Sequence, residues 1–137
     1  MNRKEFQHLS DVRLREAKVL LRAGLYDGAY YLGGYAVECA LKACIAKRTN
    51  RHEFPDKKRA EASYTHRLKD LLVAAGLENE HSVHLASDKR FSDNWDVVAR
   101  WSEQKRYTIN QTDEACKLLI AIGQRDYGVL TWLKRRW

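Results

Sequence analysis

Hydrophobic positions recur every three or four residues along nearly the whole chain of 137 residues. This spacing is typical of amphipathic helices, each with an apolar stripe that faces a core. It predicts helices over residues 3–23 and 28–48, a third from Thr65 to Gly76, and a last one that begins at Thr112. Asn2, Asp27 and Asp93 are placed to begin helices as N-caps, the last of them a short helix with Trp95 and Trp101.

Three segments lack a clear pattern. Residues 49–64 contain the only proline, Pro55, and are predicted to form a long loop. Residues 102–111 are predicted as a connection, and residues 78–91 stay open, with a further helix that carries His81 and His84 as one alternative. The whole pattern predicts an all-α fold: one domain, residues 1–137, folded as a single up-and-down bundle of about four to five helices.

The second predicted helix is apolar on almost all sides, which marks the central helix of a small bundle. Gly33 and Gly34 lie in its middle, where each glycine costs about 1 kcal/mol relative to alanine, so a packing or functional reason is expected. Glu38 and Lys42 are spaced for an ion pair on one face of this helix. The pair is either an ordinary surface contact or a partly buried one that helps to specify the structure.

The charge is unevenly distributed. The chain has 25 Lys and Arg against 18 Asp and Glu, a net charge of +7. One concentration is a basic loop that contains Lys47, Arg48, Arg51, Lys57, Lys58 and Arg59. A second is the tail Lys134, Arg135 and Arg136. Both can bind phosphate or simply form a solvated surface, and the sequence leaves these alternatives open.

Several function classes are disfavoured by what the sequence lacks. Cys39, Cys44 and Cys116 form no CxxC pair, so neither a disulfide framework nor a metal site is expected, and the thiols are predicted to be buried. Gly33 and Gly34 lie in mid-helix and form no phosphate-binding loop, and no cofactor is expected. No apolar run approaches the roughly 18–20 residues of a membrane span, and no signal peptide is evident. We expect a cytoplasmic protein without a membrane partner.

Three segments together resemble the HEPN domain family, a name that stands for higher eukaryotes and prokaryotes nucleotide-binding. They are GLYDGAYY followed by AVECALKA in residues 24–43, Thr65-His66-Arg67-Leu68, and Trp101 followed by Arg106-Tyr107. The resemblance implies a compact helical bundle that forms a homodimer. Many relatives are encoded beside a small nucleotidyltransferase, and a subset are metal-independent ribonucleases that act as toxins or antiviral effectors. In that subset an Arg and a His, about four to six residues apart near the start of the last helix, converge across the dimer cleft.

This chain departs from the ribonuclease pattern, because no histidine follows Arg106. The pairs Arg3–His8 and Arg59–His66 match the spacing but lie elsewhere in the sequence. The leading hypothesis is therefore a non-catalytic HEPN module, in a toxin–antitoxin-like context, that dimerises and binds a nucleotide, RNA or a partner nucleotidyltransferase. The alternative is a metal-independent ribonuclease toxin that uses Arg59, His66 and Arg106. A third reading is a purely structural assembly subunit.

The ligand-binding candidates are Glu38, Lys42, His66, Arg106 and Tyr107. His66 is the best single histidine, with capping of the third helix as its structural alternative. Tyr107 is predicted to pack on the core, and Arg106 to bind either a carboxylate such as Glu38 or a phosphate. The other histidines, His8, His52, His81 and His84, are predicted to be exposed. The tyrosines of the second helix and the tryptophans Trp95, Trp101 and Trp132 are predicted as packing residues.

Overall fold

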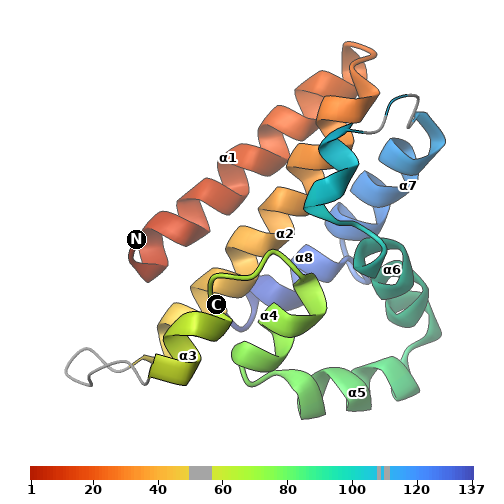
Figure 1. The fold of residues 1–137 in the computed structure, drawn as a ribbon. Coiled ribbons are helices and arrows are strands. Elements are labelled where there is room, and N and C mark those ends of the chain that lie inside the picture. The colour runs from red at the N-terminus through yellow and green to blue at the C-terminus, as the bar shows by residue number, and fades with distance from the viewer. Residues whose placement is uncertain (50–56, 108, 110–111) are drawn as a thin grey trace.

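The fold is all-α, as predicted. The computed structural model describes residues 1–49, 57–107, 109 and 112–137, without the side chains of Arg59 and Arg106. In these ranges the helices are α1 (Arg3–Arg22), α2 (Tyr26–Arg48), α3 (Lys57–Ala62), α4 (Leu68–Ala74), α5 (Glu78–Ser87), α6 (Lys89–Ala99), the 3-10 helix η1 (Glu103–Tyr107), α7 (Thr112–Gly123) and α8 (Val129–Lys134). The bundle therefore contains more helices than the four to five predicted (Figure 1).

The first two helices form an antiparallel hairpin (Figure 1). A capping box begins α1: Glu5 N–H donates to Asn2 Oδ1 at 3.0 Å, and Asn2 N–H donates to Glu5 Oε2 at 2.7 Å. Gly24 ends the helix in the left-handed conformation with φ 76°. The prediction of Asp27 as the next N-cap is wrong, because α2 begins at Tyr26 and Asp27 lies in its first turn. A carboxylate there still interacts favourably with the helix dipole.

Helix α2 is the centre of the fold, as its apolar character predicted. It packs against α1, α4, α7, α8 and η1, while α5 and α6 lie on the side away from α1 (Figure 1). Both mid-helix glycines have a packing reason. A Cβ on Gly33 would clash with Leu119, and one on Gly34 would clash with the indole of Trp101. Close helix contacts therefore account for two residues that cost helix stability.

The middle of the chain contains one helix that the sequence did not predict, since residues 57–62 form α3 inside the predicted long loop. Residues 78–87 form α5, the helix with His81 and His84 that was one alternative for this segment. The prediction that Thr65 opens the next helix is wrong, because α4 begins only at Leu68. Thr65 instead accepts a hydrogen bond from the Arg67 N–H through its hydroxyl at 3.1 Å. This local bond competes with helix formation and holds residues 65–67 outside α4.

Two further boundaries differ from prediction. Helix α6 begins after Asp88, whose Oδ1 accepts the N–H groups of Arg90 and Phe91 at 3.0 and 3.2 Å, and not after Asp93. The predicted last helix is interrupted between Gly123 and Gly128 and continues as α8. Across the ranges the structure describes, no helix is both long and apolar enough to cross a membrane.

Candidate functional site

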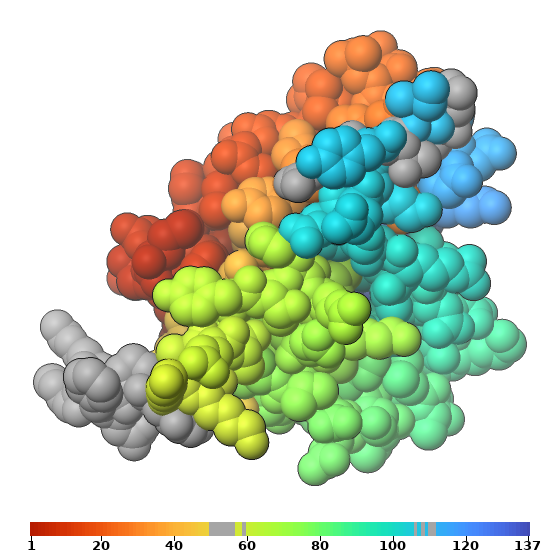
Figure 2. Space-filling model, viewed as in Figure 1, coloured from red at the N-terminus to blue at the C-terminus, as the bar shows by residue number. Residues whose placement is uncertain are grey.

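A surface cavity of about 720 Å³ lies where three elements meet. Its walls are residues 65–70, which lead into α4, and residues 99–104, which join α6 to η1. These two segments meet on one face of the molecule, yellow-green and cyan in Figure 2. Volumes of about 300–1,000 Å³ are typical of small-molecule sites.

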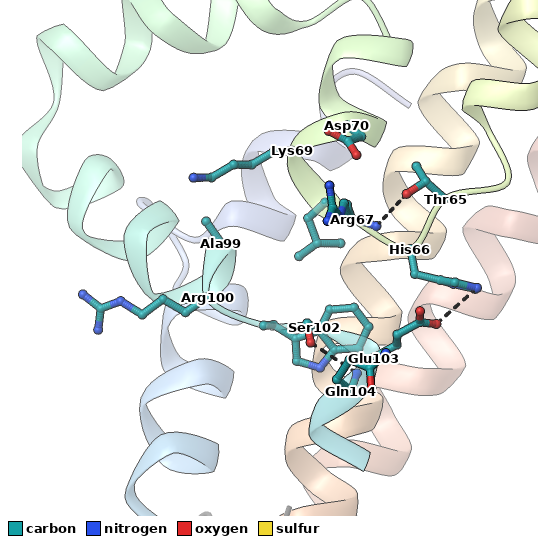
Figure 3. Close-up of a pocket in the computed structure, with 12 residues that line it drawn as sticks. Thr65, His66, Arg67, Lys69, Asp70, Ala99, Arg100, Ser102, Glu103 and Gln104 are labelled. Carbon is teal, nitrogen blue, oxygen red and sulfur yellow. Dashed lines mark hydrogen bonds and ion pairs between the residues drawn. The ribbon is translucent and has the colours of Figure 1, made fainter. Parts of the chain in front are cut away.

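A chain of alternating charges begins on α2 and ends at one side of this cavity. Glu38 is 1% exposed, and its Oε1 accepts the Lys42 Nζ at 2.9 Å. The same oxygen lies 2.9 Å from His66 Nδ1. His66 Nε2 in turn lies 3.3 Å from Glu103 Oε2, so the imidazole bridges α2 and η1 (Figure 3). The i, i+4 pair of the sequence analysis is therefore the buried alternative, because it anchors a histidine from a distant segment.

The bridging geometry limits the chemistry that His66 can perform. Both ring nitrogens face carboxylate oxygens, and only the protonated ring has two N–H groups to donate to both. A ring held in this way positions Glu103 and is not free to remove a proton from a substrate. The Oε2 atom of Glu38 is buried and has no hydrogen-bond partner among the described residues.

Three cations surround the other parts of the cavity: Arg67, Lys69 and Arg100. All three are exposed, and within the described ranges no carboxylate lies at ion-pair distance from any of them. Figure 3 shows the ends of Lys69 and Arg100 extending to one side, away from the His66–Glu103 pair. The sequence pointed to Arg67 only as part of the Thr65–Leu68 segment, and it gave no indication of Lys69 or Arg100. Their sequence positions carry no signal, because folding alone brings the two segments together.

The cavity contains no activated thiol. Cys39 follows Glu38 on α2 and is buried, as predicted, and burial raises the pKa of its thiol to about 12. Burial likewise raises the pKa of Cys44 to about 11. Both thiols are therefore protonated and unreactive at neutral pH. Cys116 is only half-buried, in contrast to the prediction.

The structure brings together three of the five ligand-binding candidates, namely Glu38, Lys42 and His66. The prediction that Tyr107 packs on the core is wrong, because its side chain is 75% exposed at the end of η1. The backbone of Arg106 belongs to η1, but its side chain lies outside the described structure, as does that of Arg59. Glu38, the carboxylate that was named as a possible partner of Arg106, has Lys42 and His66 at its Oε1 atom.

The basic loop and the basic tail take part in internal contacts. Lys47 Nζ donates to the carbonyl oxygen of Arg136 at 3.1 Å, and Arg48 donates to that of Ala74 at 3.0 Å. Arg48 therefore caps the C-terminal end of α4, and Lys47 bonds to the chain just beyond α8. Lys57 lies 4.0 Å from Glu61 on exposed α3, and Lys58 is exposed beside it. Arg51 lies outside the described residues.

One of the four histidines predicted to be exposed is buried. His81 is 4% exposed, with its ring 4.4 Å from that of Trp95 and close to Phe91 and Trp132. Burial, together with a smaller contribution from His84, lowers the pKa of His81 to about 4. His84 is half-buried, His8 is exposed, and His52 is not among the described residues. In the part of the chain that can be described, no three potential ligands are grouped to hold a metal ion.

Comparison with known protein families identifies the class to which this fold belongs. The model of the HEPN domain matches residues 10–125, which include most of α1 and all of α2, the cavity and α7. The chain therefore belongs to the HEPN family. Neither the curated proteins nor the solved structures include a significant match.

Proposed function

We propose that this HEPN module binds the phosphate group of a nucleotide or RNA in the cavity between residues 65–70 and 99–104, without cleaving it. The observation that carries the proposal is the set of cations around the cavity, Arg67, Lys69 and Arg100, without carboxylate partners among the described residues. Arginine and lysine bind phosphate through charge-assisted hydrogen bonds, and arginine does so in a bidentate manner. The cations that the sequence suggested first, Lys47 and Arg48, already bond to backbone carbonyl oxygens.

The engagement of His66 supports binding without catalysis. General acid–base catalysis needs a ring nitrogen that can reach the reacting proton. In His66, Nδ1 is next to Glu38 and Nε2 is next to Glu103. Cleavage would require that one of these contacts break, whereas phosphate binding by the nearby cations leaves both in place.

The proposal is tested by measuring the affinity for adenosine 5′-monophosphate and for a short single-stranded RNA. The double variant Arg67→Ala/Arg100→Ala should weaken binding by about tenfold or more, because each lost charge-assisted bond contributes on the order of 1.5 kcal/mol. Arg15→Ala is the matched control, since Arg15 is an exposed arginine on α1 outside the cavity. Equal affinities for the double variant and the control would refute the proposed site.

The same preparation distinguishes binding from the ribonuclease alternative. The RNA is incubated with the protein in the presence of a chelator, and its length is followed by gel electrophoresis. Intact RNA is the expected result. Cleavage that His66→Ala abolishes and Arg15→Ala leaves intact would replace the binding proposal with a metal-independent ribonuclease.

We also propose that the module forms a homodimer through a second surface. An apolar groove of about 470 Å³ runs between α1 and α7, lined by Leu21, Leu119 and Ile120 among others. Ile120 is 64% exposed there, and a second copy of the chain would bury it.

Light scattering after gel filtration tests the dimer. The wild-type protein should be a dimer, and the Ile120→Asp variant should be a monomer. Val83→Asp on α5, also a highly exposed position, is the control. A monomeric wild type would favour a different occupant of the groove, such as a partner nucleotidyltransferase.

A further inference from the structure

The cavity has two chemically different ends. Lys69 and Arg100 extend to one side, and the carboxylate of Glu103 faces His66 at the other (Figure 3). A ligand that only needed a phosphate site would gain nothing from a carboxylate, which repels it. The presence of both charges in one cavity is instead suited to a ligand with an anionic group at one end and hydrogen-bond donors at the other.

Glu103 keeps the capacity to accept hydrogen bonds from a ligand. A carboxylate offers about four lone-pair positions, and the contact with His66 occupies one of them. The Glu103 side chain is 34% exposed, so its remaining positions can be reached from the cavity that it lines.

The carboxylate is also held in place, which is what discrimination between ligands requires. His66 fixes Glu103, Glu38 fixes His66, and Lys42 completes the charge balance on the buried carboxylate. Glu38 is nearly inaccessible to solvent on the central helix, so this chain of contacts is anchored in the most buried part of the fold. A positioned acceptor penalises a ligand that lacks the matching donor, because its own hydrogen bond is then left unmade.

We infer that Glu103 is a specificity residue, which accepts a hydrogen bond from a hydroxyl or amino group on the same molecule whose phosphate binds at Arg67, Lys69 and Arg100. This inference rests on the proposed function and deepens it: the ligand class is a nucleoside phosphate, with inorganic phosphate bound more weakly. The donor is a ribose hydroxyl or a base amino group. His66 acts as a positioning residue.

The test compares ligands that differ by one donor. Adenosine 5′-monophosphate is measured against its 2′-deoxy analogue, which lacks a ribose hydroxyl, and against purine riboside 5′-monophosphate, which lacks the amino group. At least one analogue should bind the wild-type protein about five- to tenfold more weakly. In Glu103→Ala this ratio should fall below about twofold, and in His66→Gln it should take an intermediate value.

Asp70→Ala is the matched control, because Asp70 is the other carboxylate that lines the cavity. Removing either negative charge raises the affinity for all phosphates alike, so the ratio between ligands, and not the affinity itself, is the informative quantity. Asp70→Ala should leave the ratio unchanged. The inference is overturned if both analogues bind the wild type as well as the parent nucleotide, or if the ratio persists in Glu103→Ala. Absence of nucleotide binding, or binding insensitive to Arg67→Ala/Arg100→Ala, would overturn the proposed function as well.

Discussion

Gly34 shows how one residue on the central helix determines the position of a cavity wall. The indole of Trp101 lies where a Cβ on Gly34 would be, and Trp101 is the point at which the chain passes from α6 to η1. Helix propensity alone would favour alanine at this position by about 1 kcal/mol. The clash opposes that gain, because Trp101 is almost completely buried and has little space in which to move.

Gly34→Ala should therefore lower the free energy of unfolding by about 2 kcal/mol, the cost of overpacking less the gain in propensity. Urea denaturation measures the change. Gly123→Ala is the control, since a Cβ on Gly123, at the end of α7, would have no neighbour within 4 Å. That variant should be neutral or slightly stabilising. Destabilisation of both variants to the same degree would contradict the role assigned to Trp101.

His81 makes the stability of the protein sensitive to acid. Burial among Phe91, Trp95 and Trp132 favours the neutral ring and lowers its pKa from 6.5 to about 4. Between these two values the unfolded chain binds a proton that the folded protein does not, so the free energy of unfolding falls as the pH falls. The expected contribution is a loss of about 2 kcal/mol between pH 7 and pH 5.

The variant His81→Gln, which cannot titrate, isolates this contribution. Urea denaturation of both proteins is measured between pH 7 and pH 5, and carboxylates elsewhere in the chain affect both proteins equally. The wild type should lose more stability than His81→Gln over this interval, even if the variant is less stable at pH 7. Parallel pH profiles would show that His81 takes up its proton over the same pH range in the folded protein as in the unfolded chain.

At the scale of the elements, Asp88 ends α5 and begins α6. Its side chain accepts two backbone N–H groups of the new helix, and its own N–H donates to the carbonyl oxygen of His84. Asp88→Ala should cost about 1 kcal/mol of stability, the usual value for the loss of an N-cap. Asp93→Ala is the control, because Asp93 forms an exposed pair with Lys89 and no other polar contact among the described residues, so its loss should cost about 0.3 kcal/mol. If thermal unfolding showed Asp93→Ala to be less stable than Asp88→Ala, Asp93 would be the N-cap, as the sequence predicted.

The sequence predicted elements well where the signals were local and uncontested. The bounds of α1 and α2 were predicted almost correctly. The signals were the capping box at Asn2, the glycine at position 24 and the apolar length of α2. The prediction of Asp93 as an N-cap was wrong, because Asp88 accepts the first N–H groups of the helix at an earlier position. Thr65 presents the same difficulty, because its hydroxyl bonds to Arg67 and delays the helix.

The sequence predicted the candidate site only where its residues lie close together in the chain. The pair Glu38 and Lys42 lies on one helix, and its spacing is visible in the sequence. Glu103 is distant in sequence from His66 and reaches it, and Arg100 lines the same cavity, because Trp101 packs on Gly34. Tyr107 and His81 were assigned the wrong environment for the same reason, since hydrophobic spacing does not show which side of a short helix faces the core.

At the scale of the whole molecule, the net charge of +7 overstates the positive charge that is available to a ligand. Lys134 Nζ lies 2.6 Å from Asp11 Oδ1, and Arg136 lies 2.7 Å from Glu80, so part of the basic tail pairs with α1 and α5. Lys47 and Arg48 bond to backbone carbonyl oxygens. Among the cations that remain, those that line the cavity are the group that we expect to meet phosphate.

This distribution of charge predicts a shallow salt dependence of RNA binding. Each cation that neutralises a phosphate of a single strand adds about −0.7 to the slope of log K against log salt concentration. Three cavity cations therefore give a slope of about −2, and Arg67→Ala/Arg100→Ala should reduce it to about −0.7. Binding is measured from about 50 to 200 mM salt by fluorescence anisotropy of a labelled oligonucleotide. A slope of about −4 or steeper that the double variant leaves unchanged would mean that RNA lies along a wider basic surface, and that the cavity is not where its phosphates bind.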